Sequence, residues 1–258
     1  MTVATVAITM VPLDMAQNSF DDQYLNCRDE MTEKLPELKR SDFLKNNTFE
    51  KVWKNATAKW QKGGSDSSTL TKDQAIALLV YTMKSVYSDF NKAVRTAGNS
   101  SWEYHDNFYF KTLHFLLTDV LQKLRNPKNC LDVFQLVNSY QFEVKTGAKI
   151  CFGQFASSSL DKTVAKYYGT DTMFEVHTCH GMDIQKFSFS QSDKEVLIPP
   201  FETFEVSDVK TEGSMLNIVL RSTGNSRNFN CGSLPRKSPN LGGLLLATMA
   251  MAVAIGTL

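Results

Sequence analysis

The sequence has almost no surplus of charge of either sign. Lys and Arg number 28 and Asp and Glu number 27 among 258 residues, which leaves a formal net charge of +1. A nucleic-acid-binding domain usually carries a clear basic surplus, so we expect no nucleic-acid partner. Hydrophobic residues at 42% and aromatic residues at 11% exclude a disordered chain and are typical of a globular domain with an ample core.

The sequence also lacks any C-x-x-C pair, which argues against a zinc site or a thioredoxin-type motif. We therefore expect no bound metal. The five cysteines are widely spaced, at Cys27, Cys130, Cys151, Cys179 and Cys231. Cys151 lies in an alternating segment, which leaves two interpretations, a buried core thiol or an exposed reactive one; we favour the first.

Both ends of the chain and three internal triplets indicate an extracellular protein. Residues 241–258 are apolar and uncharged and follow Arg236 and Lys237, so we assign residues 232–258 to a signal for glycosylphosphatidylinositol (GPI) attachment; a short membrane-anchor helix is the alternative. Residues 1–12 are apolar but short and lack a basic start, and we interpret them as the remnant of a signal peptide. N-x-[ST] triplets predict glycosylation at Asn46, Asn55 and Asn99. We expect a monomer on the outer face of the plasma membrane, with secretion as the alternative.

The remaining residues, 13–231, divide into a helical part and a β part. Between about 20 and 127, apolar residues recur at every third or fourth position, and Thr71–Gln74 has the spacing of a helix capping box. After Pro127 the pattern changes to short β-type runs, which extend from about 130 to 231. We expect helices over 49–60, from 71 onward, over 108–124 and over 160–168, and strands over 133–137, 148–152, 173–178, 195–198, 203–206 and 216–221. The sequence predicts an α+β fold, with a helical N-terminal layer packed on a C-terminal antiparallel sheet core.

The most informative segment is Gln191–Glu202. Two acidic residues, Asp193 and Glu195, precede a short apolar run that two prolines end. Residues two apart in an extended strand point to the same face, so we expect two carboxylates side by side at the start of a buried strand. An isolated pair of this kind is usually a solvated strand start. A second segment, residues 152–159 with the sequence FGQFASSS, distinguishes this one.

FGQFASSS followed by EVLIPPFE closely resembles the vertebrate ecto-mono-ADP-ribosyltransferases, which move ADP-ribose from NAD to arginine. The resemblance runs from about Ser19 to about Cys231. It implies the α+β fold of that family with a β-sandwich core, NAD as co-substrate with NADP as an alternative, and protein arginine residues as acceptors. Members with four cysteines form two disulfides, which here implies the pairs Cys27–Cys231 and Cys130–Cys179.

The resemblance also assigns roles to individual residues. Glu195 matches the catalytic glutamate, which stabilises the positive charge on the ribose as nicotinamide leaves. Asp193 takes the place of the first glutamate of the family's Glu-x-Glu pair, which engages the acceptor guanidinium. Ser157 matches the serine that helps to position the catalytic glutamate. The positions implied to contact NAD are Gln154, Ser188 and Phe189, and Phe189 is expected to stack on the nicotinamide.

The sequence departs from the family where V-[YF]-R-G is replaced by Val133–Leu136, with Gln135 at the position of the arginine. The family's arginine binds the NAD phosphates, and a glutamine offers hydrogen bonds without charge. We therefore expect weaker NAD binding, unless Lys149 or Lys162 supplies the cation.

Two hypotheses follow. One is an arginine-specific mono-ADP-ribosyltransferase. The other is a weakened or inactive relative that acts as a cell-surface binding glycoprotein, favoured by Gln135 and Asp193. NAD glycohydrolase activity, in which water replaces the acceptor, lies between them.

Overall fold

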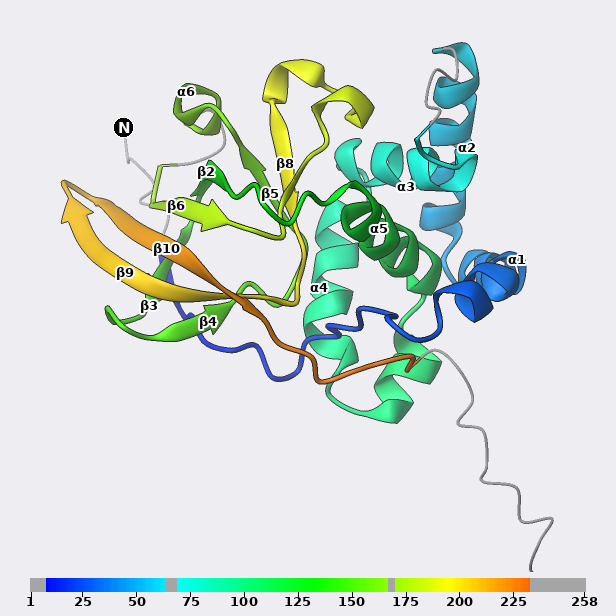
Figure 1. Ribbon diagram of the computed structural model, residues 1–258, viewed down its shortest axis with the longest axis horizontal. Coiled ribbons are helices and arrows are strands. Elements are labelled where there is room, and N and C mark those ends of the chain that lie inside the picture. The colour runs from blue at the N-terminus through cyan, green and yellow to red at the C-terminus, as the bar shows by residue number, and fades with distance from the viewer. Residues whose placement is uncertain (1–7, 64–68, 167–169, 233–258) are drawn as a thin grey trace, which may run out of the picture.

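The computed structural model describes residues 8–63, 69–166 and 170–232. Helices of the N-terminal half gather on one side of the molecule, and the strands form a large sheet on the other (Figure 1). The predicted α+β fold with a helical N-terminal layer is therefore confirmed.

The helical layer contains α1 (Arg28–Lys45), α2 (Asn47–Lys62), α3 (Lys72–Thr82), α4 (Tyr87–Ala97), the π-helical turn η1 (Glu103–Asn107) and α5 (Lys111–Leu124). The predicted capping box is present, because the Thr71 side chain accepts from the Gln74 backbone N–H and the Gln74 side chain accepts from that of Thr71. The apolar repeat that continues beyond Thr82 belongs to two helices, since the chain turns between α3 and α4. The sequence pattern does not predict helix α1, because few of its residues are buried and they form no clear apolar repeat.

The main sheet has the strand order β4–β9–β10–β6–β2–β5–β8–β7. Its strands are β2 (Leu131–Val137), β4 (Lys149–Cys151), β5 (Ala156–Ser159), β6 (Thr172–Thr178), β7 (Met182–Asp183), β8 (Glu195–Ile198), β9 (Glu202–Glu212) and β10 (Met215–Asn225). Neighbours are antiparallel except β6 and β10, which pair in parallel, so the prediction of an antiparallel core is wrong for this pair. Of the helix expected over 160–168, the described residues show α6, spanning Lys162–Ala165, and residues 167 and 168 lie outside the described residues.

The sequence pattern does not reveal β1 (Thr9–Pro12), β3 (Tyr140–Glu143), β5 or β7. Strand β5 consists of Ala-Ser-Ser-Ser, whose composition is unlike that of a typical strand. Strand β1 lies within the segment interpreted as a leader and pairs in parallel with β3. Of the attachment signal expected at 232–258, residues 233–258 lie outside the described residues. Among the helices that are described, none has the length and hydrophobicity to cross a membrane.

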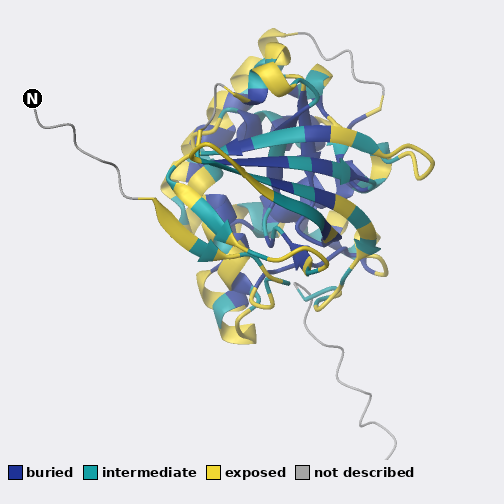
Figure 2. Cartoon of the chain, turned by 90° about the vertical axis from the view of Figure 1, so that its left-hand side faces the viewer, coloured by how far each residue is buried: buried dark blue, intermediate teal, exposed yellow. Residues whose placement is uncertain are grey.

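Buried side chains form two clusters, one among the helices and one on the sheet. The helical cluster extends to the sheet through Phe155, Ile184 and Leu197. Figure 2 shows this buried interior, with exposed residues on the outer turns of helices and at loop tips. The two layers therefore share apolar contacts close to β5 and β8.

Two residues of the recognised motifs have structural roles. Gly153 of FGQF has a φ of +65°, and a Cβ at this position would collide with Ala16, so a glycine is required. Glu202, the last residue of EVLIPPFE, is fully buried and accepts hydrogen bonds from the Thr178 hydroxyl, the Ser222 hydroxyl and the Cys179 and His180 backbone N–H groups. Burial raises the pKa of the Glu202 carboxyl, and these hydrogen bonds oppose the rise.

Both implied disulfides are present, Cys27–Cys231 and Cys130–Cys179. The first joins residues 204 positions apart and fixes the C-terminal segment to the start of α1. Cys151 is a buried free thiol, and burial raises its pKa to about 11, which supports the interpretation as a core residue.

We expect the Cys27–Cys231 disulfide to contribute substantially to stability. Cys27→Ala/Cys231→Ala should lower the free energy of unfolding by about 2–5 kcal/mol, because the bond restricts a long loop of the unfolded chain. Urea unfolding followed by circular dichroism measures the loss. Cys151→Ala is the matched control, since it removes one buried sulfur and keeps both disulfides; it should cost only about 1 kcal/mol. Equal losses in the two variants would contradict the expectation.

Candidate active site

A cleft opens where the main sheet divides between β2 and β5. These strands share a single residue pair, Phe134 opposite Ser159, whereas β5 and β8 pair over four residues. The cleft has a volume of about 230 Å³. Its lining comes from both halves of the sheet, from α6 and from the turn into α4: Lys84, Tyr87, Phe134, Gln135, Leu136, Ser157, Ser158, Ser159, Ala165, Asp193 and Glu195.

Glu195, the first residue of β8, is only 3% exposed, and both of its carboxylate oxygens are held. Ser157 donates its hydroxyl to Oε1, and Ser188 donates to Oε2 at 2.9 Å. Burial raises the pKa of the Glu195 carboxyl, while the two serine hydroxyls and the nearby Lys84 ammonium lower it. The result is a carboxylate fixed in position at the wall of a cleft.

The serine triplet of β5 serves three different partners because side chains alternate along a strand. Ser157 and Ser159 lie on the same face as Glu195, which is directly opposite Ser159. Ser157 holds the Glu195 carboxylate, and Ser159 donates to the backbone carbonyl of Asp193 at 2.8 Å. Ser158 donates to the Val196 carbonyl at 3.0 Å. The triplet thus fixes the whole start of β8.

Asp193 also lines the cleft, but the expected extended geometry is wrong. Asp193 ends the 3₁₀ turn η3 (Gln191–Asp193), and Lys194 adopts the left-handed conformation with a φ of +47°. Lys194 turns outward to pair with Asp161 at 2.9 Å. The backbone reversal, not strand alternation, brings Asp193 and Glu195 to the same cleft.

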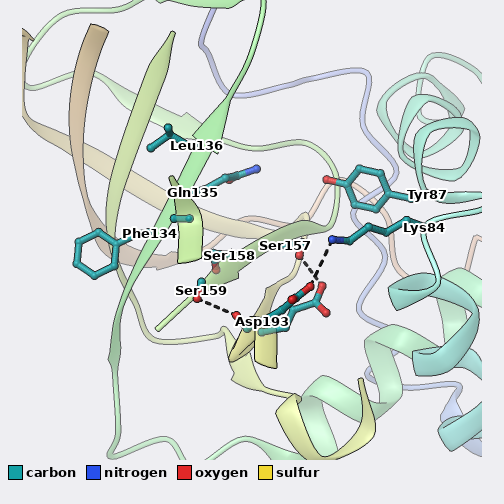
Figure 3. Close-up of a pocket in the computed structure, with 11 residues that line it drawn as sticks. Lys84, Tyr87, Phe134, Gln135, Leu136, Ser157, Ser158, Ser159 and Asp193 are labelled. Atoms are coloured by element: carbon teal, nitrogen blue, oxygen red, sulfur yellow. Dashed lines mark hydrogen bonds and ion pairs between the residues drawn. The ribbon is translucent and has the colours of Figure 1, made fainter. Parts of the chain in front are cut away.

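The helical layer contributes two lining residues that the sequence motifs do not indicate, Lys84 and Tyr87. Lys84 Nζ lies 3.5 Å from Asp193 Oδ2 (Figure 3). Lys84 has a φ of +61° in the turn that follows α3, where a glycine is usual. No signal in the sequence indicates this position, because the apolar repeat continues without interruption from α3 into α4.

Gln135 lies on β2 and reaches toward Tyr87, whereas Phe134 points the other way (Figure 3). The Gln135 amide oxygen is buried without a hydrogen-bond partner among the described residues.

The two lysines proposed as alternative cations do not belong to the cleft lining. Lys162 pairs with Glu175 at 2.6 Å and lies 5.5 Å from the centre of the Phe134 ring, and Lys149 lies on β4, at the far edge of the sheet.

The other predicted site residues lie around the cleft. Ser188 is buried, and its hydroxyl donates to the Glu195 carboxylate, which lines the cleft. Phe189 is 49% exposed, with Lys59 Nζ 3.7 Å from its ring centre, and it is not part of the cleft lining. Gln154 also lies outside the lining, and its amide oxygen is buried without a partner among the described residues. The stacking role of Phe189 and the NAD contact of Gln154 stay predictions.

The three candidate glycosylation sites all lie on α2 or close to a helix end. Asn55 and Asn99 are exposed. Asn46 is half-buried and caps α2 by accepting from the Phe49 backbone N–H at 3.0 Å. Glycosylation of all three stays a prediction.

This arrangement is suited to stabilising a transient positive charge. A carboxylate in a site partly shielded from water interacts strongly with a cation, and the two serines remove the need for it to reorganise. Asp193 adds a second, more exposed carboxylate whose side chain is 20% exposed.

Comparisons with known proteins identify the same architecture. The family model described as NAD:arginine ADP-ribosyltransferase matches residues 13–228. The erythroblast NAD(P)(+)–arginine ADP-ribosyltransferase of Gallus gallus is 44% identical over 236 residues, covering 89% of this chain and 78% of that protein. The GPI-linked NAD(P)(+)–arginine ADP-ribosyltransferase 1 of Mus musculus is 39% identical over 255 residues, covering 93% of this chain and 78% of that protein.

Solved structures agree. The crystal structure of the eucaryotic mono-ADP-ribosyltransferase ART2.2 superposes with a TM-score of 0.75 at 35% identity, covering 86% of this chain and 98% of that one. A variant of ART2.2 in complex with NAD superposes with a TM-score of 0.74 at 34% identity, with the same coverage.

We expect Ser157 and Ser188 to control the titration of Glu195. Removing either hydroxyl by substitution with alanine takes away a hydrogen bond to the charged form, so the pKa of Glu195, already raised by burial, should rise further. Carbon-13 NMR of labelled glutamate carboxyls follows this titration directly. Ser158→Ala is the control, since Ser158 donates to a backbone carbonyl, and it should leave the titration unchanged. An unaltered pKa in both Ser157→Ala and Ser188→Ala would refute this account.

Proposed function

Because the chain belongs to the NAD:arginine ADP-ribosyltransferase family, we propose that it transfers ADP-ribose from NAD to arginine side chains of proteins at the cell surface. The observation that carries the proposal is Glu195, a buried carboxylate fixed by two serines at the wall of a cleft.

In the proposed reaction the bond between ribose C1′ and the nicotinamide nitrogen breaks, and nicotinamide leaves with the electron pair. The ribose gains the character of an oxocarbenium ion, and the negative charge of Glu195 stabilises it. A guanidinium nitrogen of the acceptor then bonds to C1′ and releases one proton to solvent. Glu195 must be ionised, so activity should be lost as the pH falls through its raised pKa.

The cleft suits the reacting end of NAD. Pockets that enclose a whole small ligand have volumes of ~300–1,000 Å³, so a cleft of about 230 Å³ accommodates only part of a dinucleotide. The buried Gln135 oxygen, which has no partner among the described residues, can accept a hydrogen bond from a ribose hydroxyl or the nicotinamide amide. NADP is an alternative co-substrate, as the names of the relatives indicate.

A second candidate is a weakened transferase that mainly hydrolyses NAD or binds a partner. It is favoured by the replacement of the family's arginine with Gln135 and by the Lys84–Asp193 ion pair, which occupies the carboxylate expected to hold the acceptor.

For location, we propose a monomer held on the outer face of the plasma membrane by a GPI anchor, with secretion as the alternative. The support is the apolar segment 241–258 and the GPI-linked relatives.

If the missing arginine limits the site, Gln135→Arg should lower the KM for NAD. A charge-assisted hydrogen bond contributes ~1.5–3 kcal/mol, so binding should strengthen roughly 10–150-fold. The double variant Gln135→Arg/Leu136→Gly is tested as well. The single variant is kept beside it because Leu136 is buried, so that its replacement by glycine lowers stability. Turnover of labelled NAD with agmatine as acceptor gives the kinetics.

Glu195→Gln is the control and should abolish turnover in every background, because the substitution at position 135 does not supply the charge at the ribose. Unchanged KM in both arginine variants, with turnover that still depends on Glu195, would show that another cation serves the phosphates.

The anchor has its own test. Phosphatidylinositol-specific phospholipase C should release the protein from the surface of cells that express it, because a GPI-anchored chain has no membrane-spanning segment. Retention after treatment, with residues 241–258 still detectable by mass spectrometry, would indicate a membrane-spanning tail instead.

A further inference from the structure

We propose that Lys84 determines acceptor specificity by occupying the carboxylate of Asp193, so that an arginine acceptor must displace an internal cation before it binds. The inference rests on the proposed function, in which Asp193 receives the acceptor guanidinium. It identifies Lys84 as a competitor for that position and predicts that removing Lys84 raises transfer to arginine relative to hydrolysis.

The two oxygens of Asp193 are already engaged on different sides. Oδ1 accepts from the Ser190 hydroxyl at 2.9 Å, and Oδ2 lies 3.5 Å from Lys84 Nζ. The Asp193 backbone is fixed as well, since its carbonyl accepts from Ser159. A guanidinium binds a carboxylate best through two parallel hydrogen bonds to both oxygens. Such an approach requires that Lys84 leave Oδ2.

Lys84 is held in this position by the backbone of the turn between α3 and α4. It has a φ of +61° and donates its backbone N–H to the Tyr81 carbonyl at 3.2 Å. Lysine is a poor choice for the left-handed conformation, which favours glycine or asparagine. Its ammonium is the only cation among the described residues that line the cleft. A charged residue at a strained turn, directed at an acidic residue of the cleft, indicates a role for the charge.

The ion pair is weak enough to be displaced. The Lys84 side chain is 45% exposed and that of Asp193 is 20% exposed, so water screens the pair. The competition should therefore change the affinity for an acceptor severalfold without blocking it.

The test uses agmatine, a small guanidinium compound, and measures its equilibrium binding to the purified protein by NMR titration, which requires no NAD turnover. Lys84→Met should lower the agmatine dissociation constant about two- to fivefold, the range expected for an exposed ion pair. Lys84→Gly should lower the agmatine dissociation constant in the same way. Because glycine suits the left-handed backbone, this variant keeps the test valid if Lys84→Met folds poorly. Added salt should reduce the difference between these variants and the original protein.

Two controls locate the effect. In the Asp193→Asn background, Lys84→Met should give no gain in agmatine binding, because the shared carboxylate is gone. Lys59→Met removes a cation that contacts Phe189 beside the same loop, and it should leave agmatine binding unchanged.

Kinetics give a readout that a merely structural role would not alter. Lys84→Met should lower the KM for agmatine, leave the KM for NAD unchanged and raise the ratio of transfer to hydrolysis. A higher KM for NAD would place Lys84 on the dinucleotide and overturn the proposal. So would agmatine binding that is undetectable, that neither Lys84 variant changes, or that improves equally in the Asp193→Asn background.

The binding and kinetic arms separate this proposal from the proposed function. Agmatine binding that follows the expected pattern in a protein that never turns over NAD would uphold the role of Lys84 and refute the transferase. Transfer of ADP-ribose from NAD to agmatine, together with agmatine binding that is insensitive to Lys84, would uphold the transferase and refute the role of Lys84.

Discussion

The single residue pair that joins β2 to β5 is the constraint on which the site depends. Two fully paired strands would close the sheet and bury their side chains against each other. Because Phe134 and Ser159 alone are paired, the strands diverge and leave a cleft between the two parts of the sheet. The same row of residues continues from Ser159 to Glu195 across β5 and β8. The carboxylate therefore lies at the junction, on a strand that is itself completely buried.

Two carboxylates enter this cleft in different physical states. Glu195 is buried, and its two serine partners compensate for part of the cost of removing its charge from water. Asp193 is more exposed and has a lysine for a neighbour. A fixed, desolvated charge suits the stabilisation of a developing cation, whereas a screened charge with an exchangeable partner suits the temporary binding of an acceptor. The difference in burial thus matches the two roles proposed for these residues.

The positive charge of the cleft lies on the side of Asp193. Position 135 has an uncharged amide whose buried oxygen has no partner among the described residues, and the ammonium of Lys84 lies beside the Asp193 carboxylate. Under the proposed function, the first feature would weaken the binding of NAD and the second would weaken the binding of the acceptor.

The sequence alone determined the α+β class, because the change from helical to β-type periodicity near Pro127 depends only on local order. The motifs also identified Glu195, Ser157 and the two disulfides, since a long match carries the positions of all its residues. The sequence did not show strand β5, because three serines have no strand-like pattern until their partners on β8 are in place. It placed Asp193 on an extended strand, because the left-handed turn at Lys194 is a tertiary compromise that composition does not indicate. Lys84 belongs to a turn 109 positions before Asp193, and only the packing of the helical layer on the sheet brings the two charges together.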